Sequence, residues 1–128
     1  MSITFMILLM IFCHIVDDYY LQGWLASAKQ KEWWMKNAPG KLYEKDYVWA
    51  LLMHSFSWSF MIMLPIAIYT GFEVGAMYIV GVILNTAVHA LTDDLKANQK
   101  FINLWWDQII HLIQIACTAL IFIEGYVR

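Results

Sequence analysis

Four long stretches of the chain are almost continuously apolar. They run approximately over residues 3–28, 47–69, 74–95 and 104–126. A membrane-spanning helix needs about 20 mostly apolar residues, because the hydrocarbon core of a bilayer is roughly 30 Å thick. The stretches are too long and too continuous for strands, and the alternating pattern of a membrane barrel is absent. The pattern predicts an all-α integral membrane protein that forms a single four-helix bundle over residues 1–128.

The composition supports a membrane protein. Hydrophobic residues make up 62% of the chain and charged residues 14%, against roughly 45–50% and 25% in a soluble domain. These values exclude disorder and argue against a soluble globule. The formal net charge of −2 lacks the basic field that nucleic-acid binding requires, so we expect no nucleic-acid partner. No basic start precedes the first apolar stretch, which we expect to be retained as a helix rather than removed as a signal peptide.

Basic residues predict the orientation, because Lys and Arg accumulate in short cytoplasmic loops. Five of them lie between the first two apolar stretches: Lys29, Lys31, Lys36, Lys41 and Lys45. Lys96 and Lys100 lie between the last two stretches, and Arg128 alone falls on the other side. Both of these loops are therefore predicted in the cytoplasm, with both termini outside it.

Polar residues inside the apolar stretches carry the functional information, since ionisable groups in hydrocarbon normally face the protein interior and mark function. Three His/Asp pairs recur at a spacing of four residues, which places both members on one helix face: His14 with Asp18, His89 with Asp93, and Asp107 with His111. The fourth histidine, His54, stands alone. At about 1.5 Å per residue, all four histidines come out roughly 8–13 Å below the cytoplasmic surface. One shared polar cluster is predicted.

Four imidazoles with at least three carboxylates suit a divalent transition metal, with zinc favoured over manganese or iron and one or two ions expected. We predict six ligands: His14, Asp18, His54, His89, Asp93 and His111. Four further residues are expected to orient these ligands through hydrogen bonds: Gln22, Gln108, Asp17 and Asp94. Two alternatives stay open, in which His54 is only a hydrogen-bonded packing residue or the His/Asp pairs form a proton path.

The motifs also show a faint internal repeat. His-x3-Asp in the first stretch is followed by His54, and His-x3-Asp in the third is followed by His111. Two such hairpins would be related by a pseudo-two-fold axis along the membrane normal.

The motif order covers nearly the whole chain: His14-x3-Asp18-Tyr19-x-Leu21-Gln22, Lys29, His54, His89-x3-Asp93-x2-Lys96 and Asp107-Gln108-x2-His111. It resembles the domain of unknown function 3307 family of small bacterial and phage membrane proteins. The departures are Tyr19, where the family pattern has Phe, and the extra acids Asp17 and Asp94. The resemblance implies a helical protein of the bacterial inner membrane with a His/Asp/Gln/Lys signature, and it suggests a role in modifying the host membrane.

The leading functional hypothesis is a metal-dependent hydrolase that acts on a membrane lipid or lipid-linked substrate at the cytoplasmic leaflet. Asp107 is the candidate general base, and Lys29 or Lys96 would offset developing negative charge. The alternatives are a carrier or channel for divalent metal ions or protons, and a non-catalytic membrane protein with a structural metal site. The outer halves of the stretches contain few polar residues, which favours a one-sided pocket over a conduit, although a homodimer would supply a path that one copy lacks.

Overall fold

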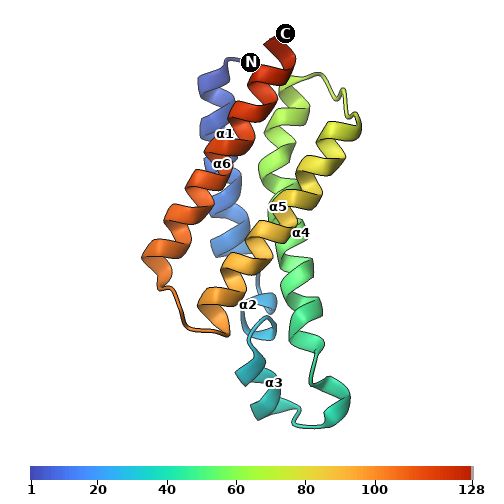
Figure 1. Ribbon diagram of the computed structural model, residues 1–128, viewed down its shortest axis with the longest axis vertical. Helices are drawn as coiled ribbons and strands as arrows, with labels where there is room; N and C mark the ends of the chain where they lie inside the picture. Colours follow the sequence, from blue (N-terminus) through green and yellow to red (C-terminus); the bar gives the residue numbers. More distant parts are fainter. Residues whose placement is uncertain (128) are drawn as a thin grey trace.

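The computed structural model describes residues 1–127, and these residues form helices and connections without a strand. Along the chain the elements are α1 (Ile3–Ile15), the π-helix η1 (Val16–Leu21), α2 (Leu25–Ala28), α3 (Lys31–Asn37), the 3-10 helix η2 (Lys41–Tyr43), α4 (Asp46–Tyr69), α5 (Ala76–Ala97) and α6 (Leu104–Val127) (Figure 1). The all-α prediction is confirmed.

Four helical segments are long and apolar enough to cross a membrane: Ile3–Leu21, Lys41–Tyr69, Ala76–Ala97 and Leu104–Gly125. They fit a multi-pass membrane protein. Their outward faces carry large apolar side chains, among them Phe5, Leu8 and Phe12 on α1, each more than half exposed. Such side chains suit contact with lipid tails, since no water is available there to solvate a polar surface.

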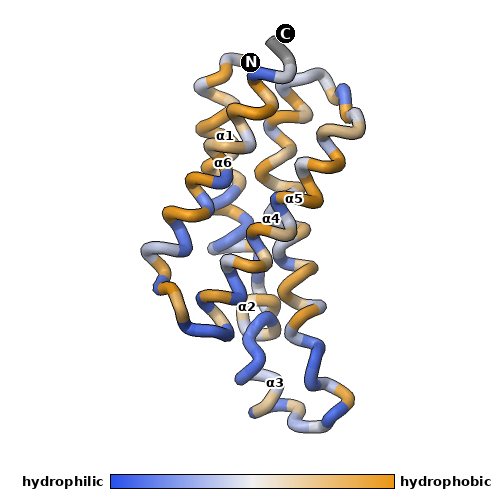
Figure 2. The backbone as a smooth tube through the Cα atoms, viewed as in Figure 1, coloured by the Kyte–Doolittle hydropathy of each residue, from blue (hydrophilic) through white to orange (hydrophobic). Residues whose placement is uncertain are grey.

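The two ends of the molecule differ in polarity. The start of α1, the end of α6 and the α4–α5 connection lie at one end, whereas α2, α3 and the α5–α6 connection lie at the other (Figure 1). Hydrophilic residues gather at this second end and hydrophobic residues predominate at the first (Figure 2). The two lysine-bearing connections are therefore on the same side, as the orientation argument requires.

The first helix differs from the continuous helix expected over residues 3–28. It changes to a π-helix at Val16 that ends at Leu21, and α2 begins only at Leu25, after Gly23, whose φ is +47°. A positive φ is strained for residues with a Cβ and accessible to glycine, so Gly23 permits the break between η1 and α2. The other three long helices begin and end within two residues of the expected bounds.

The interior has two tiers. α4 contacts α1 and α5, and α6 contacts α1 and α5. In the half nearer the start of α1, an apolar core is formed mainly by methionine, isoleucine and aromatic side chains, including Met6, Met10, Ile62 and Ile115. The polar residues singled out in the sequence fill the other half, towards α2. The fold thus places the candidate site between the apolar core and the hydrophilic end.

Candidate metal centre

Eight titratable side chains from all four long helical segments meet in the polar tier, each at most 4% exposed: His14, Asp17, Asp18, His54, His89, Asp93, Asp107 and His111. Histidines from three helices contact one another. The Nε2 atoms of His54 and His89 are 3.3 Å apart, and the rings of His89 and His111 stack at 4.2 Å between centroids. The single cluster expected from the depth of the histidines is present.

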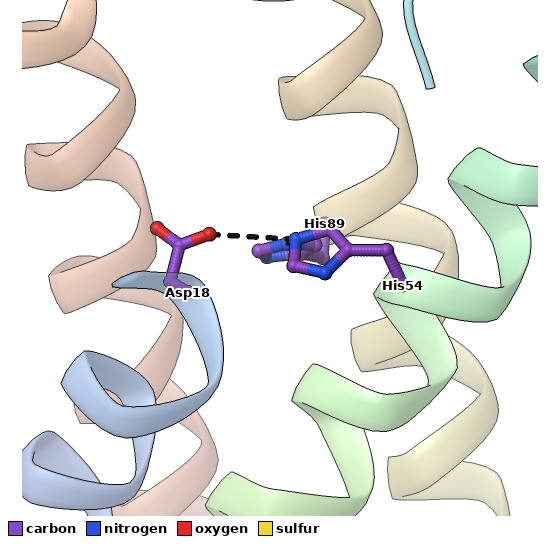
Figure 3. Close-up of side chains that lie close together, drawn as sticks. All are labelled: Asp18, His54 and His89. Atoms are coloured by element: carbon purple, nitrogen blue, oxygen red, sulfur yellow. Dashed lines mark hydrogen bonds and ion pairs between the residues drawn. The ribbon is translucent and has the colours of Figure 1, made fainter. Parts of the chain in front are cut away.

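Six of these residues form three overlapping groups that could hold a metal ion: Asp18 with His54 and His89, His89 with Asp93 and His111, and Asp18 with Asp107 and His111. Figure 3 shows the first group, in which Asp18 from η1 faces His54 from α4 and His89 from α5. Five of the six predicted ligands belong to these groups. The sixth, His14, does not.

The spacing of the donor atoms matches a tetrahedral ion. Zn–N and Zn–O bonds of about 2.0–2.2 Å separate neighbouring ligand atoms by about 3.3–3.6 Å. His54 Nε2 lies 3.4 Å from Asp18 Oδ1 and 3.5 Å from Asp93 Oδ2. His111 Nε2 lies 3.4 Å from Asp107 Oδ1 and 3.5 Å from Asp93 Oδ1. These pairs are spaced as neighbouring ligand atoms around a small cation would be, whereas His89 Nε2 and Asp93 Oδ2 are 3.8 Å apart.

Several of the same atoms have no hydrogen-bond partner although they are buried. They are Oδ1 of Asp18, Asp93 and Asp107, together with Nε2 of His111. An unsatisfied buried polar atom is destabilising, and more so when it carries charge. Each of the four atoms belongs to a residue of the candidate ligand groups, so binding of metal ions there would satisfy them.

Asp17 is buried beside Asp18, although in a regular α-helix adjacent residues would lie about 100° apart. The π-helix, with its wider turn, lets η1 bury both carboxylates. Ser57 Oγ donates to Asp17 Oδ1 at 2.7 Å, and Asp17 Oδ2 lies 3.9 Å from His54 Nδ1. A carboxylate behind an imidazole is a common way to orient a metal-binding histidine. Asp17 therefore lies behind His54 as an orienting carboxylate would, but without a hydrogen bond to its Nδ1.

Two lysines neutralise part of the cluster. Lys29 is buried and donates to Asp93 Oδ2 at 2.5 Å, so it pairs with a candidate ligand instead of lying free at the headgroup level. Lys96 donates to Asp107 Oδ2 at 2.6 Å and lies 3.8 Å from Asp93 Oδ1. With neutral imidazoles, the four carboxylates and two ammonium groups of the cluster leave a formal charge of −2. One divalent cation would balance this charge.

Asp107, the predicted general base, lies within the cluster, where both of its carboxylate oxygens face candidate partners. Its Oδ2 accepts from Lys96 and from Gln108 Nε2, the latter at 3.0 Å. Its Oδ1 faces His111 within one of the three candidate ligand groups. This geometry gives Asp107 the surroundings of a ligand.

His14 is bonded at both ring nitrogens, which explains why it stands outside the ligand groups. Trp58 Nε1 donates to His14 Nδ1 at 2.8 Å, and His14 Nε2 lies 3.0 Å from Gln108 Oε1. His14, which the sequence predicts to be a ligand, therefore belongs to the cluster but lies outside the three ligand groups, where it is hydrogen-bonded to Trp58 and Gln108.

The remaining residues expected to orient ligands divide between the cluster and its margins. Gln108 Nε2 donates to Oδ2 of both Asp18 and Asp107. Gln22 reaches only the backbone carbonyl of Asp18. Asp94 lies away from the ligand groups, where it accepts hydrogen bonds from Asn98 and Gln99 beyond the end of α5.

Trp58 is the residue that the sequence reasoning missed. It is fully buried and stacks on His89 with ring centroids 4.2 Å apart. The Nδ1 atoms of His89 and His111 have no hydrogen-bond partner, so stacking holds these rings in place. The available signal was spacing, because Trp58 follows His54 by four residues and thus shares its helix face.

A cleft of about 910 Å³ adjoins the cluster between α1, η1 and the first turns of α6. Apolar side chains such as Ile11, Ile15 and Leu112 line it, together with His14 and Gln108. These two polar residues connect the cleft to the candidate ligands through the hydrogen bonds of Gln108 to Asp18 and Asp107.

Comparisons with protein-family models, curated proteins and solved structures found no match to this chain.

Proposed function

We propose that this protein is a membrane-embedded, metal-dependent hydrolase that acts on a lipid or lipid-linked substrate in the cytoplasmic leaflet of a bacterial inner membrane. The observation that carries the proposal is the set of buried His and Asp donor atoms, 3.3–3.5 Å apart, four of which have no hydrogen-bond partner. In this proposal the four spans form a bundle of two hairpins related by a pseudo-two-fold axis, which supplies ligands from every span.

The three ligand groups share Asp18, His89 and His111, so they would hold either one ion or, with the residues divided between two sites, two ions. Asp18, His54 and His89 would hold one ion, and Asp93, Asp107 and His111 would hold the other. Zinc is favoured because imidazole and carboxylate ligands with room for a further ligand are typical of catalytic zinc sites. A bound ion would polarise the scissile bond and lower the pKa of a water towards about 7.

The chain's own residues would supply orientation and charge. Asp17 would hold His54 with Nε2 towards the ion. Lys29 would fix the carboxylate of Asp93 through its buried ion pair. Lys96, whose side chain is 23% exposed, would offset negative charge that develops on the substrate, because a fixed ammonium in a poorly solvated site stabilises an anionic transition state.

The lipid substrate is supported by the cleft between α1 and α6. Its lining belongs to segments long and apolar enough to cross a membrane, so a substrate reaching it would come from the bilayer. The apolar lining suits a hydrocarbon chain, and the polar pair of His14 and Gln108 lies on the side of the candidate ligands.

The first test is elemental analysis of purified protein, followed by profiling of lipids in cells that express it. We expect about one or two zinc equivalents per chain, and His89→Ala should lose most of them, because a site with few protein ligands depends on each of them. Lys36→Ala, an exposed lysine distant in sequence from the ligands, serves as the control. Protein that carries no metal and takes none up on addition would exclude the hydrolase.

A second candidate, a carrier for divalent cations or protons, is favoured by one observation. The polar column continues beyond His89 and His111 through Asn85, Gln114 and Thr118. Gln114 Nε2 donates to Asn85 Oδ1 at 2.8 Å, and Thr118 Oγ1 donates to the same oxygen at 3.1 Å. Zinc or proton flux into protein-loaded vesicles, abolished by His89→Ala, would replace the hydrolase with this carrier. Bound metal without flux or lipid turnover would indicate a structural metal.

A further inference from the structure

A chain of four buried or half-buried hydrogen bonds runs from α4 across α1 to α6 and ends on two candidate ligands. Trp58 Nε1 donates to His14 Nδ1 at 2.8 Å. His14 Nε2 lies 3.0 Å from Gln108 Oε1. Gln108 Nε2 then donates to Asp18 Oδ2 and to Asp107 Oδ2, each at 3.0 Å.

The chemistry of the groups determines where each hydrogen lies. An indole N–H can only donate, so His14 Nδ1 must be the unprotonated nitrogen that accepts it. The proton of the neutral ring is then on Nε2, which donates to Gln108 Oε1. The amide nitrogen of Gln108 has two hydrogens, and each of the two carboxylates accepts one. Every donor in this series of hydrogen bonds is used once.

The reverse orientation of the Gln108 amide is disfavoured by the same contacts. Turning the amide over would bring Oε1 against the two carboxylate oxygens and the amide N–H groups against the ring N–H of His14. Acceptors would face acceptors and donors would face donors, an arrangement that is costly for partly buried polar groups. The direction of the amide therefore depends on the position of the proton on His14, and hence on Trp58.

We propose that Trp58, His14 and Gln108 are positioning residues that turn Asp18 and Asp107 so that Oδ1 of each faces the metal ion. The hydrogen bonds from Gln108 occupy Oδ2 of both carboxylates, and the two Oδ1 atoms are the ones left buried without a partner. This inference rests on the metal site of the proposed function but not on hydrolysis.

Zinc affinity measured by chelator competition tests the orienting step. Gln108→Leu and His14→Leu should each weaken zinc binding 10–100-fold, the usual effect of removing a group that orients ligands. His14→Gln should recover most of the affinity, because its amide can still donate towards Gln108 Oε1. Gln30→Leu is the matched control, a half-buried glutamine whose Nε2 donates to the backbone carbonyl of Ala26, and its affinity should equal that of the wild type.

The ¹⁵N shifts of the His14 ring test the proton position independently of metal. Wild-type protein should show Nε2 protonated and Nδ1 unprotonated, and Trp58→Phe should lose this preference and weaken zinc binding. A proton on Nδ1 in the wild type would overturn the proposal, as would equal zinc affinities for His14→Leu and His14→Gln. If His14 has the expected tautomer but wild-type protein binds no zinc, the metal site and the positioning role of these three residues are both excluded. The hydrogen bonds among Trp58, His14 and Gln108 would then be correct without that role.

Discussion

Asp93 is fully buried and lies within 4 Å of two lysines and three histidines. Its pairing with Lys29 joins α5 to the segment that folds back after η1, so each partner stabilises the other in a place without water. Removing one partner of a buried ion pair leaves an uncompensated charge, which is typically more destabilising than removing both.

We therefore predict that Lys29→Met lowers the free energy of unfolding by about 3–5 kcal/mol, and that Lys29→Met combined with Asp93→Asn is less destabilised than the single variant. Denaturant titration of the metal-free protein in micelles measures both. Lys100→Met is the matched control, because the exposed Lys100–Glu32 pair, at 3.7 Å, should contribute less than about 1 kcal/mol. Equal losses of unfolding free energy for Lys29→Met and Lys100→Met would show that the buried ion pair contributes no more to stability than the exposed one.

A second prediction concerns Asp107, which the sequence predicts to be a general base and which lies in one of the candidate ligand groups. Asp107→Asn keeps the shape of the side chain but replaces a charged donor oxygen, so metal content should fall as far as it does in Asp93→Asn. Asp94→Asn, one residue from Asp93 but bonded to Asn98 and Gln99, should keep its metal. Full metal content in Asp107→Asn, with loss of lipid turnover, would restore the role of general base.

At the scale of single residues, the sequence predicts which groups gather but not how they pair. Spacing and depth are enough to bring His54, His89 and His111 together, because helix geometry converts position in the chain into position in space. The partners of His14 depend on how α1, α4 and α6 pack, which no local pattern encodes. The burial of Lys29 could not be predicted from the sequence either, since it requires the turn at Gly23.

Among the elements, η1 and the turn after it have the greatest effect on the site. Asp17 and Asp18 of the π-helix are both buried. Gly23 at φ +47° separates η1 from α2, at whose end Lys29 reaches Asp93. An apolar run with a few acids predicts a helix here, but it does not distinguish i→i+4 from i→i+5 hydrogen bonding. This is why the long helices could be predicted closely and the segment over residues 16–30 could not.

We predict that Gly23→Ala destabilises the protein by about 1–2 kcal/mol, because a Cβ is strained in the left-handed region. The nearest atom to the added Cβ would be the carbonyl oxygen of Leu21 at 3.8 Å, so the effect should come from backbone strain and not from a clash. Gly75→Ala is the control, as Gly75 has φ −89° and no atom within 4 Å of such a Cβ. Thermal unfolding in micelles should show a lower midpoint for Gly23→Ala only.

The whole molecule is polarised along its long axis, with an apolar core at one end and the charged cluster towards the other (Figure 2). The aromatic group of Trp24, Trp33 and Trp34 lies beside the lysine-bearing connection, and indole rings of this kind favour the interface between lipid and water. The candidate metal centre therefore lies on the interfacial side of the molecule, where a lipid headgroup would be within reach.

The last prediction is the orientation of this axis in the membrane. Because Lys and Arg accumulate on the cytoplasmic side, α3 should face the cytoplasm and the α4–α5 connection should face outwards. Single cysteines at Asn37 and at the exposed Phe72, introduced after Cys13→Ser and Cys117→Ser, report the two sides to a membrane-impermeant maleimide. In intact spheroplasts we expect labelling at Phe72→Cys only, and in permeabilised ones labelling at both positions, which controls for accessibility. Labelling of intact spheroplasts at Asn37→Cys instead would invert the topology, and the candidate metal centre would then serve the outer leaflet.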